Sequence, residues 1–158
     1  MDTRESDAGG GSPMLLPTPS HVDRRLDVTW KLSRRETEAR SLVRGIVTIR
    51  NVAEESLDLS FAKVTGGVTR PGVDGYLGHL DQVPPSVVRR ARLAPGQSLE
   101  IEALVGTTPT GDRPLDAGDY VAICPLVLGI GSSRLKATYV LRAPLVVRSN
   151  SGSLGAFA

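Results

Sequence analysis

Three aspartates in the stretch "GDRPLDAGDY" are the residues whose type and spacing come nearest to a metal site. Asp112, Asp116 and Asp119 would offer carboxylate oxygens, the ligands that a hard cation such as Ca²⁺ prefers. Their spacing does not follow an EF-hand loop, and aspartate beside glycine commonly forms turns by bonding to its own backbone. The two histidines, His21 and His79, have no Cys or His companion at zinc-ligand spacing. We therefore expect no metal site.

The other residue types that could carry chemistry also lack partners in the sequence. Cys124, the single cysteine, cannot form an internal disulfide and lies in an apolar run, where a thiol usually behaves as a small buried hydrophobe. The serines fall mostly in turns, tails and solvent-facing positions, without a visible base and orienting group. The glycine-rich "GGVTRPGVDG" lacks the lysine and the helix start of a phosphate-binding loop. The sequence thus predicts no catalytic residue, no cofactor-binding residue and no enzyme activity.

Length and composition indicate one globular domain. A chain of 158 residues can bury most of the surface that its unfolded form exposes, and 40% hydrophobic with 23% charged residues is near the globular average. No stretch approaches the roughly eighteen apolar residues of a membrane span, and the first residues lack a basic start followed by a long apolar region. We expect a cytoplasmic protein with no membrane partner.

Alternation of apolar and polar residues predicts β-strands. Leu26, Val28, Trp30 and Leu32 share one face of the first predicted strand, with polar residues between them. In "LVRGIVTIRN" the apolar residues again take alternate positions, and arginine and threonine mark the solvent-facing side. The stretch "VAEES" predicts a hairpin connection into "LDLSF", whose leucines and phenylalanine face inward. The first part of the chain is thus predicted to be half-buried strands.

The second half of the chain contains one irregular stretch and further strands. Between residues 63 and 86, glycines and prolines predict loops with one short edge strand at most. The Pro-Gly pair of "LAPGQS" predicts a tight turn into the strand "LEIEALV". A long strand from Tyr120 to about Ile130, a hairpin at "GIGSSR" and a last strand in "LKATYVLRAPLVVR" complete the pattern.

The stretch "LDAGDY" stands immediately before the long predicted strand. It resembles the tyrosine corner of immunoglobulin-like and fibronectin-III-like domains, in which a tyrosine near the start of strand F bonds back to the backbone upstream. The resemblance implies that Asp116 and Gly118 make the turn and that Tyr120 closes it. It also implies that "VTIRNVAEESLDLSF" forms strands B and C and that "LAPGQSLEIEALV" forms a turn and strand E.

About seven or eight strands and no convincing helix predict an all-β fold, an antiparallel immunoglobulin-like β-sandwich with flexible termini. Residues 1–22 combine Gly, Ser, Pro, Asp and Thr with a single apolar pair, so we expect a flexible N-terminal tail there. The sandwich is expected over residues 23–149. A flexible C-terminal tail is expected over residues 150–158.

Arginines in "VVRRAR" raise the question of nucleic-acid binding. Arg89, Arg90 and Arg92 could contact phosphates through paired N–H donors. Alternation sends Arg89 to the opposite face from Arg90 and Arg92, and no aromatic stacking platform lies alongside. The formal net charge is only +2. We therefore expect no nucleic-acid partner.

Oppositely charged residues also stand on two strands that the predicted fold makes neighbours. In an immunoglobulin-like domain strands B and E lie side by side, so Arg44 and Arg50 would face Glu100 or Glu102 across the solvent-facing surface. Such pairs neutralise a basic face.

Two functions remain, from different classes. The first is a non-enzymatic module that binds a protein partner or takes part in a self-assembled structure, which fits an all-β scaffold without a catalytic constellation. The alternative is an intracellular protease inhibitor. "VTIRNVAEESLDLSF", "LAPGQSLEIEALV" and "LDAGDYVA" are similar in order and spacing to the bacterial intracellular proteinase inhibitor family, which is also immunoglobulin-like. No inhibitory residue is carried over from that family.

The last residues, "RSNSGSLGAFA", end a polar stretch with apolar side chains that have no sandwich strand left to join. We keep two interpretations open: a disordered end or one folded back over the domain, and a short peptide that docks on a partner by adding a strand or by inserting Leu154 and Phe157 into pockets. Leu154 and Phe157 are therefore the candidate partner-binding residues.

Overall fold

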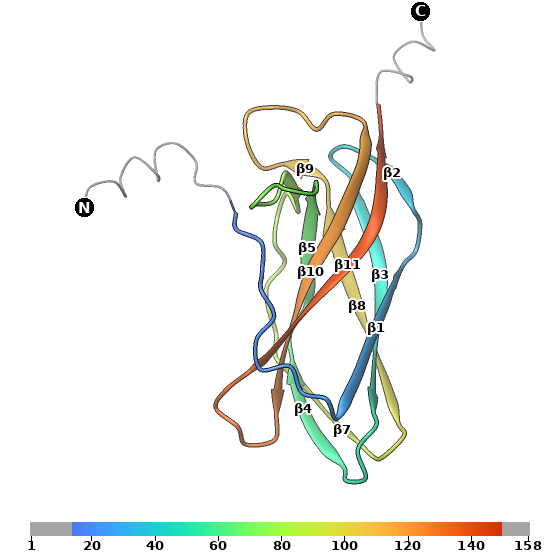
Figure 1. The fold of residues 1–158 in the computed structure, drawn as a ribbon, viewed down its shortest axis with the longest axis vertical. Coiled ribbons are helices and arrows are strands. Elements are labelled where there is room, and N and C mark those ends of the chain that lie inside the picture. Colours follow the sequence, from blue (N-terminus) through green and yellow to red (C-terminus); the bar gives the residue numbers. More distant parts are fainter. Residues whose placement is uncertain (1–13, 150–158) are drawn as a thin grey trace, which may run out of the picture.

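The computed structural model describes residues 14–149 and folds them into β-strands alone (Figure 1), which confirms the all-β class. No helix occurs in this part of the chain, and so no part of it has a helix that could span a membrane. The two longest strands, β10 and β11, run side by side. The strands are β1 (Leu26–Leu32), β2 (Glu36–Glu38), β3 (Leu42–Asn51), β4 (Leu57–Phe61), β5 (Val64–Thr69), β6 (Gly78–His79), β7 (Arg89–Leu93), β8 (Ser98–Gly106), β9 (Thr108–Pro109), β10 (Gly118–Ile130) and β11 (Ala137–Arg148).

The strands form two layers around one core. In the first layer β3 pairs antiparallel with β1 on one side and with β8 on the other. In the second layer β10 pairs with β11 along its length and with β4 near its C-terminal end, and β7 joins the outer edge of β4. The sets β1–β3–β8 and β4–β10–β11 correspond to the A-B-E and C-F-G strands of an immunoglobulin-like domain. The main strands therefore have an immunoglobulin-like arrangement.

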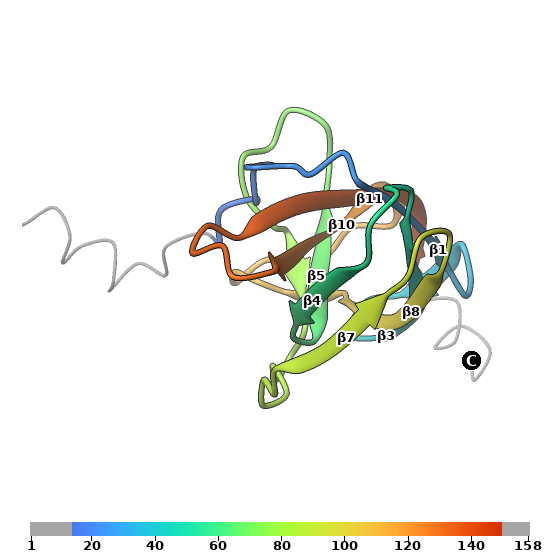
Figure 2. The same cartoon turned by 90° about the horizontal axis from the view of Figure 1, so that it is seen from below.

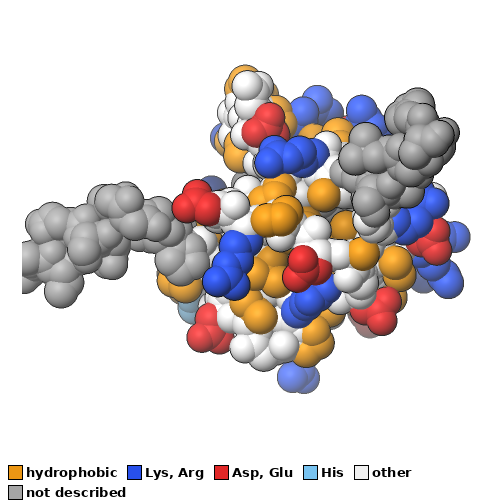
Figure 3. All heavy atoms as spheres, turned by 90° about the horizontal axis from the view of Figure 1, so that it is seen from above, with side chains coloured by type: hydrophobic (Ala, Val, Ile, Leu, Met, Phe, Trp, Pro, Cys, Tyr) orange, Lys and Arg blue, Asp and Glu red, His pale blue; other side chains and the backbone are white. Residues whose placement is uncertain are grey.

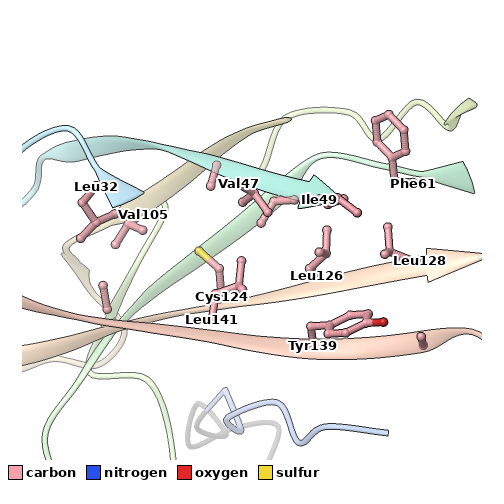
Figure 4. Packing of buried hydrophobic residues seen from close by; sticks show 14 of the residues in the cluster. Leu32, Val47, Ile49, Phe61, Val105, Cys124, Leu126, Leu128, Tyr139 and Leu141 are labelled. Carbon is pink, nitrogen blue, oxygen red and sulfur yellow. The ribbon is translucent and has the colours of Figure 1, made fainter. Parts of the chain in front are cut away.

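The core lies between the layers and is filled by the predicted inward faces. Along β3, Val43, Val47 and Ile49 are fully buried while Arg44 and Arg50 are exposed, as alternation predicts. The apolar residues of β1 and β4 also face inward as predicted. Figure 4 shows side chains of β3 directed toward those of β10 and β11 across this core, the labelled members being Val47, Ile49, Cys124, Leu126, Leu128, Tyr139 and Leu141.

β5 corrects the prediction that residues 63–86 form loops and at most an edge strand. Residues 64–66 pair parallel with β8 of the first layer, and residues 67–69 pair antiparallel with β10 of the second. β5 therefore passes from one layer to the other and links them into one continuous sheet. At the crossing, a Cβ atom on Gly66 would collide with the backbone carbonyl of Ile123. The glycines permit this close approach of two backbones, so here they mark tight packing and not a loop.

Two parallel strand pairs correct the prediction of a purely antiparallel sandwich. One is β5 with β8, and the other is β2 with β11 at the far edge of the second layer. Only residues 33–35 separate β1 from β2. Because the chain keeps its direction through this short crossing between layers, β2 meets a strand that runs the same way. The strand number is also higher than predicted, since β5 and the short strands β2, β6 and β9 were not anticipated.

The connections between strands agree with the prediction in part. "VAEES" does not form a hairpin, because β3 and β4 belong to different layers and residues 52–56 cross between them. The Pro-Gly turn is present: the Gln97 N–H donates to the Ala94 carbonyl at 2.9 Å, and Gly96 has a φ of +80°. This turn also joins the two layers, since β7 pairs with β4 and β8 with β3. The hairpin at "GIGSSR" joins β10 to its neighbour β11, as predicted.

The chain before β1 packs along the domain. The Tyr76 N–H donates to the Met14 carbonyl at 2.8 Å, and Ser20 and Thr138 exchange two backbone hydrogen bonds. The packed part of the chain thus begins before residue 23, where the sequence placed the end of a tail. Residues 1–13 lie outside the described residues. The predicted C-terminal tail over 150–158, with Leu154 and Phe157, lies outside them as well.

Candidate binding groove

The residues predicted to form a tyrosine corner lie together at the start of β10. The Tyr120 hydroxyl donates a hydrogen bond of 2.6 Å to the backbone carbonyl of Asp116, which is the bond of a tyrosine corner. Gly118 has a φ of +147°, a conformation that favours glycine. The Arg70 guanidinium lies 4.4 Å from the centre of the Tyr120 ring and donates to the Ala117 carbonyl at 3.3 Å. Burial raises the pKa of the Tyr120 hydroxyl. These contacts stabilise a turn and present no reactive group.

The acidic cluster upstream of the corner has solvent-exposed side chains. Asp112, Asp116 and Asp119 are all exposed. Within residues 14–149, no group of three or more His, Cys, Asp or Glu side chains is arranged to hold a metal ion. His21 is exposed, whereas His79 is buried in β6, where its ring packs edge-on against the Tyr76 ring with centroids 4.9 Å apart. Burial lowers the pKa of His79 because it disfavours the charged ring.

Cys124 is completely buried between the layers. Burial raises the pKa of its thiol to about 12, since the thiolate would lose its hydration there. A thiol that stays protonated at neutral pH is a poor nucleophile. Cys124 therefore has the surroundings of a packing residue.

Some charged side chains on the strand surfaces are paired with opposite charges. Arg44 donates to Glu102 at 2.9 Å across β3 and β8, as predicted, and Arg92 contacts Asp58 at 3.0 Å across β7 and β4. Pairs as exposed as these contribute about 0–1 kcal/mol each to stability. The face in Figure 3 likewise shows basic and acidic side chains interspersed, with no continuous field of either sign.

Among the strand edges that no other strand covers, two belong to β7 and β8. β7 pairs only with β4, so its other edge carries no strand hydrogen bonds within the described chain. β8 pairs with β3 along residues 98–106, but on its other edge β5 covers only residues 103–105. The edge of residues 98–102 is therefore also open. Figure 2 shows β7 and β8 on the side of the molecule away from β11. Uncovered strand edges offer backbone donors and acceptors to another chain.

A groove of about 530 Å³ runs along residues 99–102 of β8 and reaches Arg89 at the start of β7; it is here called the β7–β8 groove. Its apolar lining includes Phe61, the half-buried Leu99 and Ile101, and Val87, which is 66% exposed. Basic and acidic side chains stand on the same lining. The full set is Phe61, Ala62, Lys63, Pro85, Val87, Arg89, Leu99, Glu100, Ile101 and Glu102. The groove thus combines apolar surface with unpaired backbone edges, the two elements that bind an extended peptide.

A larger hollow, of about 800 Å³, lies over β4 and β7 beside the hairpin between β10 and β11. Five of its eight lining residues are polar or charged, and the ion pair between Arg92 and Asp58 occupies part of it. Its apolar side chains are Leu59, which is buried, and Ala91, so it lacks the larger exposed apolar side chains of the β7–β8 groove. The β7–β8 groove is therefore the better candidate site.

The sequence contained one signal of the groove, and it was not recognised. Val83, Val87 and Val88 surround two prolines and are each more than 60% exposed. Apolar residues with such exposure indicate a binding surface when they gather in one place. Val87 lines the groove, and Val83 lines a hollow beside Glu102 and Leu104 of β8. Their position beside β8 depends on the tertiary fold, which local sequence patterns do not determine.

Comparisons with known proteins find structures with a similar fold, but they do not assign this chain to a family. The sequence matches no known protein family and no curated protein. Similar solved structures include a β-glucosidase from Erythrobacter marinus (13% identity, TM-score 0.42, covering 82% of this chain and 15% of that one). They also include the sporulation control protein Spo0M from Bacillus subtilis (14%, 0.42, 80% and 50%) and a PapD-like domain of human CEP192 (11%, 0.38, 87% and 95%). The chain thus spans half or less of the first two proteins. At these identities and TM-scores the similarity does not extend to function.

Proposed function

We propose that this protein is a non-enzymatic protein-binding module that takes an extended segment of a partner into the β7–β8 groove. The observation that carries the proposal is an apolar groove that follows the uncovered edge of β8 and ends at the first residue of β7. The bound segment would add as a strand, with its backbone pairing to β7 or β8 and its apolar side chains covering Leu99 and Ile101.

The size of the groove sets the length of the segment. β7 has five residues, and the open edge of β8 also has five. A partner strand of that length spans about 17 Å at the rise of an extended chain. The backbone bonds would supply affinity for any extended sequence, and the apolar lining would select side chains that fill it.

The experiment uses random twelve-residue peptides displayed on phage and selected on the full-length protein. The test variant is Val87→Glu, which puts a charge into the groove lining at an exposed position. The matched control is Val52→Glu, at another exposed valine, 53% accessible, which does not line the groove. Selected peptides should bind the wild type and Val52→Glu, and binding to Val87→Glu should fall by about tenfold or more.

Hydrogen exchange of the peptide complex locates the site. Bound peptide should slow amide exchange in residues 98–102 if it pairs with β8, or in residues 89–92 if it pairs with β7. A selection that enriches no peptide, or one whose peptides bind Val87→Glu as well as the wild type, would overturn the proposal.

The alternative, inhibition of an intracellular protease, rests on the sequence similarity alone. An inhibitor would slow at least one protease in a panel while remaining intact itself.

A further inference from the structure

We propose that the segment bound in the β7–β8 groove is residues 150–158 of a second copy of this chain, so that copies associate head to tail. This inference rests on the proposed function, because it names the occupant of the same groove. Three properties support it: the composition of the segment, the charges that line the groove, and the distance between groove and segment.

The composition of residues 150–158 suits a narrow apolar groove. The segment reads "NSGSLGAFA", with two large apolar side chains, Leu154 and Phe157, among small residues. In an extended chain, residues two apart point to the same side. Leu154 and Ala156 would thus share one side, directed to the lining at Leu99 and Ile101, and Phe157 would take the other side, directed to Val87 of the lining. The small neighbours allow the backbone to approach the strand edges closely.

The charges of the groove favour a neutral occupant. Lys63 and Arg89 stand on the wall that leads to β5 and β7, and Glu100 and Glu102 stand on the β8 wall. An acidic segment would meet the two glutamates, and a basic segment would meet Lys63 and Arg89. None of the side chains in residues 150–158 is charged. This segment can lie between the two walls without placing like charges side by side.

The distance across the fold prevents the chain's own segment from filling the groove. Ser149 lies near Asp116 at the start of β10, whereas the groove lies at Phe61, which pairs with Leu128 near the end of β10. Figure 1 shows β4 and β7 at the opposite end of the molecule from the end of β11. The twelve residues of β11 cover about 36 Å between these two ends. From Ser149, an extended chain reaches only about 18 Å at Leu154 and about 28 Å at Phe157. The near end of the groove, at Glu102, is five residues along the chain from Thr107, which bonds to Arg40 beside Ser149, so Phe157 can reach that end alone. The segment of the same copy therefore cannot lie along the groove as far as Leu99, and filling the groove requires the segment of another copy.

Association of this kind is heterologous, since each copy offers one groove and one segment. Such contacts produce either closed rings or open chains. The distinctive consequence is that two different defects complement each other. A copy with a blocked groove still offers its segment, and a copy with a damaged segment still offers its groove.

The experiment measures mass by sedimentation velocity over a wide range of protein concentration. The groove variant is Val87→Glu, and the segment variant is the double substitution Leu154→Asp with Phe157→Asp, both in the full-length chain. The wild type and the control Val52→Glu should form species larger than a monomer. Each of the two variants alone should remain monomeric, and an equimolar mixture of them should form a one-to-one dimer and nothing larger.

Three results would overturn the inference: a monomeric wild type at every concentration, unchanged assembly of either variant alone, or a mixture that remains monomeric. If phage-displayed peptides still bind the groove in that case, the proposed function stands and only the identity of the occupant is wrong. If the peptides fail as well, both proposals fall.

Discussion

Replacing Tyr120 by phenylalanine tests the corner at the start of β10 most directly. The substitution removes one oxygen atom and leaves the ring, which is only 4% exposed and lies beneath the Arg70 guanidinium. The packing of the ring is thus kept. The single interaction lost is the 2.6 Å hydrogen bond to the Asp116 carbonyl.

The size of the effect follows from the surroundings of that carbonyl. A hydrogen bond within a protein contributes about 0.5–1.5 kcal/mol net, and up to about 3 kcal/mol is lost when a buried partner is left unsatisfied. Asp116 is an exposed residue, so water can reach its backbone once the hydroxyl is gone. We therefore expect the free energy of unfolding to fall by about 1 kcal/mol, which corresponds to a Tm lower by about 2–4 °C for a domain of this size.

Urea unfolding followed by the fluorescence of Trp30 gives the measurement. Trp30 is the single tryptophan, and its indole N–H donates to the Arg142 carbonyl at 3.0 Å, so its emission reports the packing of β1 on β11. Tyr139→Phe is the matched control. The Tyr139 hydroxyl donates to the Asp23 carbonyl at 2.8 Å and accepts from the Asp23 N–H at 3.0 Å, so its loss should lower the midpoint further. If Tyr139→Phe lowers the midpoint and Tyr120→Phe leaves it unchanged, the corner bond does not stabilise the fold.

Three further predictions concern buried positions. Cys124 should react slowly with a thiol reagent in the native protein and quickly in urea, because its side chain is completely buried and its pKa is raised to about 12; rapid native labelling would show that the strand faces are wrongly assigned. Burial lowers the pKa of His79, so the unfolded chain takes up a proton first as the pH falls below about 6.5. The free energy of unfolding should then decrease between that pH and the native pKa of His79, with a slope of at most about 1.4 kcal/mol per pH unit. In His79→Gln the urea midpoint should not change with pH across this range. Gly66→Ala should lower the free energy of unfolding by about 3 kcal/mol, since its Cβ would collide with the Ile123 carbonyl. The control Gly111→Ala, where no atom lies within 4 Å of a Cβ, should change it by less than about 0.5 kcal/mol in the same urea titration.

Local features of the fold followed from the sequence because they depend on neighbouring residues. Alternation assigned the buried faces of β1, β3 and β4, since successive side chains of a strand point to opposite sides. The turn at Pro95 and Gly96 and the hairpin between β10 and β11 followed from the conformations that glycine and proline favour. The stretch "LDAGDY" also indicated where Tyr120 would bond.

Strand partners did not follow from the sequence. "VAEES" has the composition of a hairpin loop, yet β3 and β4 lie in different layers. Turn-forming residues reverse the chain, but they do not determine which strand the next strand pairs with. β5 was missed because two adjacent glycines are typical of a loop. Their role in a strand becomes clear only from the structure, in which the backbone of Ile123 lies against Gly66. The β7–β8 groove was missed for a related reason. It consists of edges that pairing leaves uncovered, so it can be found only after all pairs are assigned.

The crossing of β5 between the layers has a consequence for how the molecule opens. A sandwich whose layers meet only through side chains can separate by sliding or breathing, with each sheet keeping its own hydrogen bonds. Here residues 64–66 bond to one layer and residues 67–69 to the other, so separating the layers must break backbone bonds of a single short strand. We expect the amides of β5 to exchange with solvent only when the whole domain unfolds, and at the same rate as those of β10. Equilibrium unfolding should then be one cooperative transition, with no state in which one layer persists without the other.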